Sequence, residues 1–188
     1  KLASDKIFVA ANNISGKDGP KFCVVRYGNV MGSRGSVIPF FKKQIAAGAD
    51  HLTITDERMT RFWITLQQGV DFVIDSFEMM YGGEIYVPKI PSMKITDMAR
   101  NVAPDLPQKE IGIRPGEKLH EIMITKDDGR QTIELDDRYV IKPQFMYWSD
   151  DAYEKRGATE VADGFEYTSD NNSEWLSDNT FQELLTKI

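Results

Sequence analysis

The sequence predicts an α/β fold, in which a mainly parallel layer of strands and helices is followed by a small irregular lobe. Short apolar runs alternate along the chain with longer segments whose apolar residues recur at helical spacing. This alternation is typical of a parallel α/β layer. From Asp127 onward the pattern loosens into two short strands and an acidic, polar stretch, so we expect the appended lobe there.

Each expected element follows from a local pattern of residues. Gly48 ends the helix that follows the first strand, Thr65 caps the longest helix, and Gly82–Gly83 stop it. The apolar stripe of that longest helix comprises Leu66, Val70, Val73, Ile74 and Phe77. The expected helices are 2–13, about 37–47, 65–80, 95–103, one from about Lys118 and one from Ser177 to the end, and the expected strands are 21–27, 51–55, 84–88, 110–113, 131–135 and 138–142.

Composition excludes several classes of protein. The net charge of -6 and the absence of a basic stripe argue against a nucleic-acid partner. No apolar run approaches the ~20 residues that cross a bilayer, so no membrane partner is expected. The single cysteine, Cys23, excludes an internal disulfide and favours a reducing, cytoplasmic setting. The two histidines, His51 and His120, lie far apart without a metal-ligand pattern, so we expect no metal site.

The chain starts in an unusual way. Lys1 begins a helical pattern directly, with no capping run, initiator methionine or strand before it. A domain that starts inside a helix has usually lost what came before it. We therefore interpret the chain as the carboxyl-terminal portion of a larger protein.

The segment Phe22–Phe41 is the most informative stretch of the chain. A buried strand runs into a glycine-rich loop that carries Asn29 and Arg34, and the loop runs into a helix. In an open α/β sheet, ligands lie beyond the carboxyl ends of the strands. The glycine spacing suggests a dinucleotide fingerprint, but such a fingerprint belongs in the first strand–helix turn, and this loop comes later. Either the loop contacts a ligand or it only reverses the chain.

Three arginines lie near expected strand ends. Arg58 stands beside acidic residues, and a surface ion pair explains it. Arg61 directly precedes Phe-Trp-Ile, so packed aromatic residues would hold it in place, whereas Arg114 precedes a Pro-Gly turn that fixes its direction. Each is more often structural than functional, but together Arg61 and Arg114 suggest a diphosphate clamp.

Some other features have simple structural interpretations. Trp63 is most simply a core residue, and His120 a solvated helix residue. The loop Tyr167–Trp175, rich in amides and hydroxyls, either leads into the last helix or binds the hydroxyls of a sugar or nucleoside.

Four blocks, Arg26–Phe41, Thr55–Trp63, Gly83–Ser92 and Gly112–Lys118, together resemble the extended short-chain dehydrogenase/reductase superfamily. Within it they are most similar to the inverting UDP-N-acetylglucosamine 4,6-dehydratases of the pseudaminic acid pathway. The resemblance implies the carboxyl-terminal part of a Rossmann fold with its small substrate-binding lobe. Residues 1–35 would be the last Rossmann elements and 36–188 mainly the lobe, with about 65–90 returning to the Rossmann sheet.

The resemblance also assigns roles to individual residues. Lys1 would be the lysine of the catalytic Tyr-x-x-x-Lys motif, with the other catalytic residues upstream, and Val30 would contact the nicotinamide. Arg61 and Arg114 would bind the UDP diphosphate. The remaining substrate contacts would be Asn29, Arg34, Gly35, Ser36, Val37, Tyr167, Ser169 and Asn172.

The chemistry implied by the resemblance is a redox cycle on one sugar. Hydride would leave C4 for NADP (or NAD), water would leave at C6, hydride would return to C6, and reprotonation would invert C5. The implied partners are UDP-N-acetylglucosamine, a missing amino-terminal Rossmann half and further copies in a homo-oligomer. The alternatives are a retaining dehydratase, a 4-epimerase of the same fold, or a non-catalytic remnant that binds sugar nucleotides.

Overall fold

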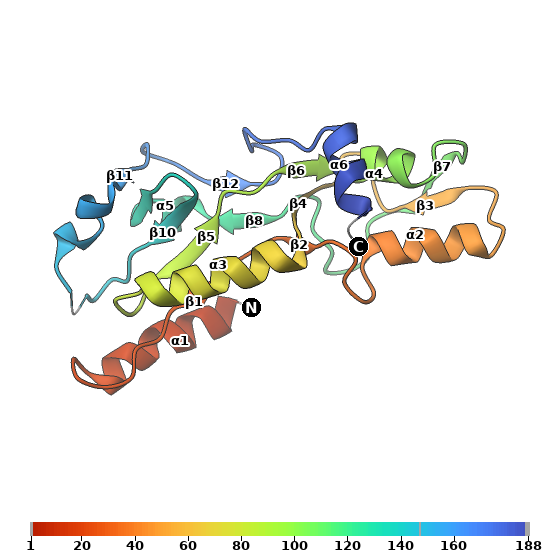
Figure 1. The fold of residues 1–188 in the computed structure, drawn as a ribbon. Helices are drawn as coiled ribbons and strands as arrows, with labels where there is room; N and C mark the ends of the chain where they lie inside the picture. Colours follow the sequence, from red (N-terminus) through yellow and green to blue (C-terminus); the bar gives the residue numbers. More distant parts are fainter. Residues whose placement is uncertain (1, 147, 187–188) are drawn as a thin grey trace. The chain divides into compact units, whose positions relative to one another are not determined.

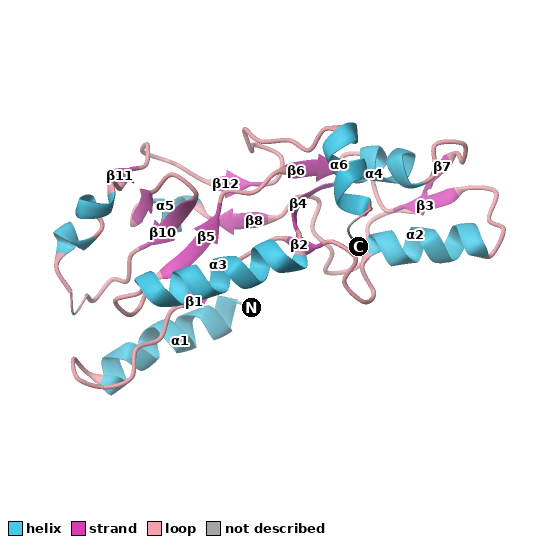
Figure 2. Ribbon diagram, in the orientation of Figure 1, coloured by secondary structure: helices cyan, strands magenta, loops and turns pink. Residues whose placement is uncertain are grey.

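The computed structural model describes residues 2–146 and 148–186, and it confirms the predicted α/β class (Figures 1 and 2). The chain forms two compact units. Unit 1 comprises Lys1–Tyr27, Val70–Lys89 and Met123–Tyr167, and unit 2 comprises Gly28–Gly69, Ile90–Ile122 and Thr168–Ile188. None of the helices in the described ranges is both long and apolar enough to cross a membrane.

Unit 1 is built on a five-stranded sheet in the order β1-β5-β10-β9-β11. The strands β1 and β5 are parallel, and every other neighbouring pair in this sheet is antiparallel. The elements of unit 1 are α1 (Leu2–Ser15), β1 (Val24–Val25), β5 (Ile85–Pro88), α5 (Lys126–Gly129), β9 (Thr132–Glu134), β10 (Arg138–Ile141), η1 (Asp150–Ala152), η2 (Glu154–Arg156) and β11 (Thr159–Glu160).

Unit 2 contains two smaller sheets. One has the order β2-β4-β6, with β2 and β4 parallel and β4 and β6 antiparallel, and the other pairs β3 with β7 in parallel. The elements of unit 2 are β2 (Asn29–Val30), α2 (Val37–Ala46), β3 (Leu52–Ile54), β4 (Thr60–Ile64), β6 (Ser92–Lys94), α4 (Ile95–Val102), β7 (Gln108–Glu110) and α6 (Asp178–Leu185). Parallel pairs are therefore present, as expected, but antiparallel pairs accompany them in both units.

Three elements pass from one unit to the other along the chain: α3 (Leu66–Met79), β8 (Ile122–Ile124) and β12 (Tyr167–Thr168). The start of α3 is a capping box: the Thr65 hydroxyl accepts from the Gln68 amide at 3.2 Å, and the Gln68 side chain accepts from the Thr65 amide at 2.9 Å. The predicted cap at Thr65 is confirmed. The apolar stripe of this helix is exposed, however, and Phe77 is 71% accessible.

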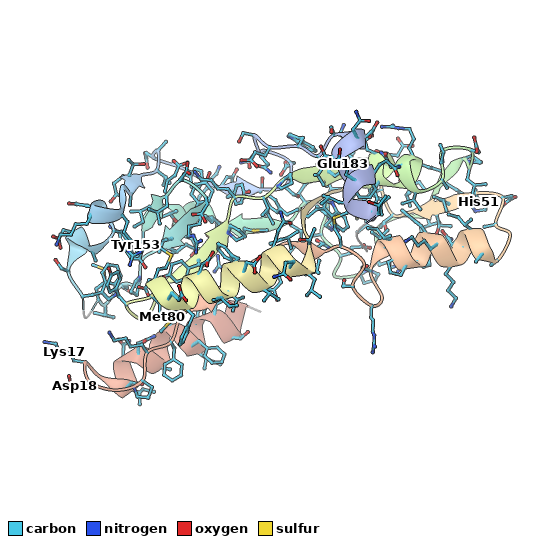
Figure 3. All side chains as sticks on the ribbon, in the orientation of Figure 1. Lys17, Asp18, His51, Met80, Tyr153 and Glu183 are labelled. Atoms are coloured by element: carbon cyan, nitrogen blue, oxygen red, sulfur yellow. The ribbon has the colours of Figure 1, made fainter. Side chains whose placement is uncertain are left out.

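The interior of unit 1 contains a polar network. The Glu84 carboxyl group accepts from the backbone amides of Tyr81 and Gly82 at 2.6 and 2.7 Å, and from the Tyr153 hydroxyl at 3.0 Å. The hydroxyl of Tyr153, a residue labelled in Figure 3, lies 2.5 Å from the hydroxyl of Tyr86. Burial, above all, raises the pKa of both tyrosines. Because these buried polar groups satisfy one another, the network fixes the loop before β5 without an unpaired donor at those positions.

Unit 2 has the larger apolar core. Phe41 of α2, Leu52 of β3, Met98 of α4 and Phe181 of α6 are fully buried in one cluster. The helix α6 packs beside α4, and α2 runs beside β3 (Figure 1). Position 28 requires glycine. A Cβ there would lie 2.6 Å from the Cβ of Phe62, so only glycine lets the segment before β2 pass this close to β4.

Two expected elements differ from the structure. The prediction of a helix from about Lys118 is wrong, because the carbonyls of Lys118 and Leu119 accept hydrogen bonds from the Arg61 side chain instead of from helical amides. The strand expected over 110–113 lies earlier, at Gln108–Glu110. The strand β4 was not predicted, because its five residues are all buried and give no alternating pattern.

The predicted domain limits can be set beside the two units. Residues 1–27 and 70–89 fall together in unit 1, but Met123–Tyr167, which the sequence interpretation placed in the lobe, falls in unit 1 as well. The assignment of either unit to a Rossmann domain or a substrate lobe stays a prediction.

Candidate functional site

Unit 2 contains a cavity of about 290 Å³. Its volume is close to that of the smallest pockets that hold small-molecule ligands. The loop before α2, the first turns of that helix, β2, the end of β3, β4 and the turn after β7 all contribute to its wall. The lining residues are Asn29, Gly35, Ser36, Val37, Phe40, Phe41, Thr53, Ile54, Thr55, Met59, Arg61, Trp63, Ile95, Ile111, Arg114 and Glu117.

The pairing of β2 with β4 brings three of these residues together. Asn29 lies beside Trp63 in the parallel register, and Arg61 precedes Trp63 by two residues on the same strand. Because side chains alternate along a strand, Arg61 and Trp63 are on the same face of β4. The cavity wall therefore combines an amide, an indole and a guanidinium group on one small sheet.

Arg61 is tied into the protein by most of its donors. One terminal nitrogen donates to the carbonyls of Thr60 and Leu119 at 2.7 and 2.9 Å, and the other donates to the carbonyl of Lys118 at 2.7 Å. Its Nε lies 3.6 Å from a carboxylate oxygen of Glu121. Burial lowers the pKa of Arg61, but a guanidinium group stays protonated in proteins, so the positive charge remains. Arg61 thus anchors the loop after Glu117 and leaves little of its fork for a ligand.

Arg114 offers the opposite situation. It is exposed, it lines the cavity, and no hydrogen bond or ion pair holds its guanidinium group within the described ranges. Its backbone is fixed by a turn, in which the Glu117 amide donates to the Arg114 carbonyl at 3.0 Å. A fixed backbone with a free guanidinium group suits the bidentate binding of a phosphate.

Glu117 was missed as a site residue in the sequence. It lines the cavity three residues after Arg114, and its carboxylate lies 3.4 Å from the Arg114 amide. A carboxylate accepts hydrogen bonds from hydroxyl groups. The turn from Arg114 to Glu117 could have revealed this residue, because it brings Glu117 back to the same side as Arg114.

The amino terminus of α2 also reaches the cavity. Gly35 has φ +76°, a conformation that favours glycine, and Ser36 is the N-cap residue, but the Ser36 side chain makes no capping hydrogen bond. Gly35, Ser36 and Val37 all line the cavity, as do Asn29, Arg61 and Arg114. Helix amino termini attract anions because their amides are unpaired and the helix dipole is positive there.

Other predicted site residues lie elsewhere. Arg34 is exposed and does not line the cavity, Val30 pairs with Ile64 in the β2–β4 ladder, and Lys1 lies outside the described residues. Arg58 forms the expected ion pair: it binds Asp56 through two donors at 3.0 and 2.7 Å, and this pairing lowers the pKa of Asp56 to about 2.

Three predicted residues of the substrate loop are buried, whereas Asp170 and Asn171 between them are exposed. Ser169 is fully buried, with its hydroxyl 2.7 Å from the Thr60 hydroxyl, and it accepts from the Glu121 amide at 2.9 Å. The side-chain amide of Asn172 donates to the carbonyls of Ile90 and Glu174, both at 2.8 Å. Tyr167 is buried with its ring 5.1 Å from that of Tyr139. None of the three lines the cavity, and their contact with substrate stays a prediction.

His120 is not the solvated helix residue that the sequence suggested. Its Nδ1 lies 2.8 Å from the Thr60 hydroxyl, and its Nε2 lies 3.9 Å from an Asp170 oxygen. Thr60 and Ser169 are buried, so this group of side chains holds the loop around residue 169 against β4 and presents no accessible nucleophile.

The α/β fold is consistent with the comparisons. The chain belongs to the polysaccharide biosynthesis protein family, whose model matches residues 1–143. It is 56% identical, over 98% of its length, to a UDP-N-acetylglucosamine 4,6-dehydratase (inverting) of Campylobacter jejuni. It is 35% identical, over its whole length, to a UDP-glucose 4-epimerase of Rickettsia bellii. The chain spans 57% of the first relative and 56% of the second, so a little over half of each.

Solved structures give the same picture of the fold. The chain superimposes over its whole length on Pen from Bacillus thuringiensis, with a TM-score of 0.85 and 31% identity, covering 56% of that chain. A UDP-N-acetylglucosamine 4-epimerase from Methanobrevibacter ruminantium, in complex with UDP-N-acetylmuramic acid, matches 61% of this chain and 40% of its own, with a TM-score of 0.51 and 25% identity.

Proposed function

We propose that the protein containing this chain converts UDP-N-acetylglucosamine, by dehydration across C5 and C6 and inversion at C5, into a UDP-4-keto-6-deoxy-hexosamine. The observation that carries the proposal is the unit 2 cavity, where Arg61, Arg114 and the amino terminus of α2 meet. The identity of 56% to a relative named as the inverting dehydratase supports the same substrate. Use of the product for pseudaminic acid in surface or flagellar glycans belongs to the proposal.

Within this proposal, different cavity residues bind different parts of the sugar nucleotide. Arg114 and the amino terminus of α2 bind the diphosphate, because they offer free donors and positive potential. Glu117 accepts hydrogen bonds from ribose hydroxyls, and Asn29 contacts the sugar. Arg61 contributes its charge and holds the loop that follows Glu117.

A nicotinamide cofactor, NADP in preference to NAD, belongs to the same proposal and supplies the acceptance and return of hydride. Lys1 and Val30 are the residues of this chain that would lie near it. The task of the cavity is to orient the sugar diphosphate so that the reacting carbons are presented in one geometry. No residue of unit 2 has to act as a nucleophile in this chemistry.

The test is a product assay on the full-length protein. Incubation with UDP-N-acetylglucosamine and NADP is expected to give, by NMR, a 4-keto sugar with a C6 methyl group and an inverted C5 centre. A retained C5 centre would indicate the retaining dehydratase, and a changed C4 centre without loss of oxygen would indicate the epimerase that the Rickettsia relatives suggest. An unchanged sugar that still binds would indicate the non-catalytic alternative.

The 188-residue chain alone is expected to show no turnover. We propose that an amino-terminal Rossmann half carries the catalytic tyrosine and the phosphate loop of the cofactor site. The bare apolar faces of α1 and α3 support this partner, since Ile14 is 90% and Phe77 71% accessible. Turnover by the chain alone would contradict it. A cytoplasmic location and a homo-oligomeric state complete the proposal.

A further inference from the structure

The three tryptophans of the chain differ in the fate of their indole N–H groups. Trp148 donates to the Gly82 carbonyl at 3.0 Å, and Trp175 donates to the Asn172 carbonyl at 2.8 Å. The N–H of Trp63, by contrast, has no hydrogen-bond partner in the part of the chain that the structure describes. An indole nitrogen is a donor only, so it can be satisfied only by an acceptor.

Trp63 is also the most deeply buried of the three tryptophans. It is 2% accessible, and it lines the unit 2 cavity. A buried donor left without a partner destabilises a protein, and such groups in native proteins call for an explanation. A role in packing accounts for the ring of Trp63, but packing does not require the N–H group.

A second unpaired polar atom lines the same cavity. The Ser36 hydroxyl is buried without a partner among the described residues, although its position as the N-cap of α2 would let it accept a backbone amide. Residues that line one cavity thus keep both a hydroxyl and an indole N–H unused. This is the arrangement expected when a ligand supplies the missing partners.

The neighbours of Trp63 indicate what the ligand offers. Asn29 lies beside it in the β2–β4 register, and the positive charge of Arg61 is on the same face of β4. We infer that the Trp63 N–H is a ligand-binding donor that pairs with an acceptor oxygen of the sugar nucleotide, and that the Ser36 hydroxyl is satisfied by the same molecule. The inference rests on the proposed function and adds to it a contact at Trp63.

The test compares Trp63→Phe with Trp175→Phe in the full-length protein, by calorimetric titration with UDP and with UDP-N-acetylglucosamine. Each experiment is run well below the melting temperature of its variant. Trp63→Phe is expected to weaken binding about 3- to 10-fold, the loss of one hydrogen bond, and Trp175→Phe to leave it within twofold. If both ligands weaken, the acceptor lies on the UDP part, and if only the sugar nucleotide weakens, it lies on the sugar. Unchanged affinity for both would overturn the inference.

Ser36→Ala separates ligand binding from a structural role. An N-cap serine that makes its capping hydrogen bond stabilises its helix, so removing that serine lowers the melting temperature. Here the side chain makes no such bond, so the melting temperature of the free protein should not fall, while the affinity for UDP-N-acetylglucosamine falls at least twofold. A lower melting temperature with unchanged affinity would show a structural role and overturn the assignment of Ser36.

The proposed function and this inference fail in different ways. If the wild-type protein binds neither UDP nor UDP-N-acetylglucosamine, the proposed function is wrong and the inference is overturned with it. If the wild-type protein binds both and Trp63→Phe binds equally well, the function stands and only the role of Trp63 is wrong.

Discussion

The two units leave different kinds of surface unsatisfied. In unit 2 the unpaired groups are polar and line a cavity, and the exposed apolar side chains of Phe40 and Ile111 line the same cavity. In unit 1 the buried polar groups around Glu84 satisfy one another, one nitrogen of the Arg26 guanidinium group is buried without a partner among the described residues, and apolar side chains such as Phe77 lie open to solvent. Unpaired polar atoms in a cavity suit a small polar ligand, and a bare apolar helix face suits a protein surface.

The two units therefore differ in the kind of partner that their surfaces suit. Unit 2 has an apolar core and, beside it, a cavity lined by polar and charged residues. Unit 1 has a buried apolar cluster around β5 and β10, and its helix α1 and most of α3 carry exposed apolar residues. Predictions for unit 1 therefore concern folding, and those for unit 2 concern affinity.

The largest effect is expected for Glu84→Ala in unit 1. This substitution leaves two backbone amides without an acceptor in the interior and removes the carboxylate to which the Tyr153 hydroxyl donates. At about 1–3 kcal/mol for each unsatisfied group, partly relieved by water, the free energy of unfolding should fall by about 3–5 kcal/mol. Urea denaturation measures it, with exposed Glu78→Ala as the control. A loss no larger than that of the control would show that the network does not hold unit 1 together.

The next effect concerns the bare face of α3. In the 188-residue chain Phe77→Ala should change stability by less than about 0.5 kcal/mol, because Phe77 is already exposed there. In the full-length protein the same change should cost about 2–3 kcal/mol if a Rossmann half covers the residue. Paired denaturation experiments on the two lengths measure the difference. Equal effects in both would remove the argument for a covering partner.

A smaller effect is expected in unit 2, and it should appear in binding only. Arg114→Ala removes a free guanidinium group from the cavity wall, so UDP binding to the full-length protein should weaken by about 1.5–3 kcal/mol. Because the Arg114 side chain holds no other group, stability should stay within about 0.5 kcal/mol of wild type. Calorimetry and urea denaturation measure the two quantities. Arg130→Ala, at an exposed arginine of unit 1, is a control that should change neither.

The smallest effect is a dependence of stability on pH at Cys23 in unit 1. Burial, with a smaller contribution from Glu84, raises the pKa of this thiol to about 11, against 9.0 in its ordinary state. Between about pH 9 and 11 the folded thiol keeps its proton and the unfolded one loses it, so stability falls as pH rises. Urea denaturation at several pH values should show a shallower fall for Cys23→Ala. Identical slopes would contradict the shift.

The sequence predicted those features whose cause is local. The cap at Thr65, the helix that starts at Val37 and the buried strand at Ile85 each follow from neighbouring residues. Two residues that the sequence singled out beside glycine or proline turns, Gly35 and Arg114, line the unit 2 cavity, and their roles in binding stay predictions.

The sequence failed where distant residues decide the structure. The segment at Lys118 and Leu119 is not helical, because the carbonyls of these two residues accept hydrogen bonds from Arg61, which is distant in the sequence. Trp63 resembled any buried aromatic residue, since only the three-dimensional contacts reveal that its N–H is unpaired. Ser169 and Asn172 make internal hydrogen bonds that no local pattern foretells, and their contact with substrate stays a prediction.

The central claim is that the cavity of unit 2 is the sugar-nucleotide site. A crystal structure of the full-length protein with UDP-N-acetylglucosamine tests it most directly. We predict a diphosphate within hydrogen-bonding distance of the Arg114 guanidinium group and an acceptor oxygen at the Trp63 indole nitrogen. A ligand bound elsewhere, with the cavity between Asn29 and Glu117 empty, would contradict it.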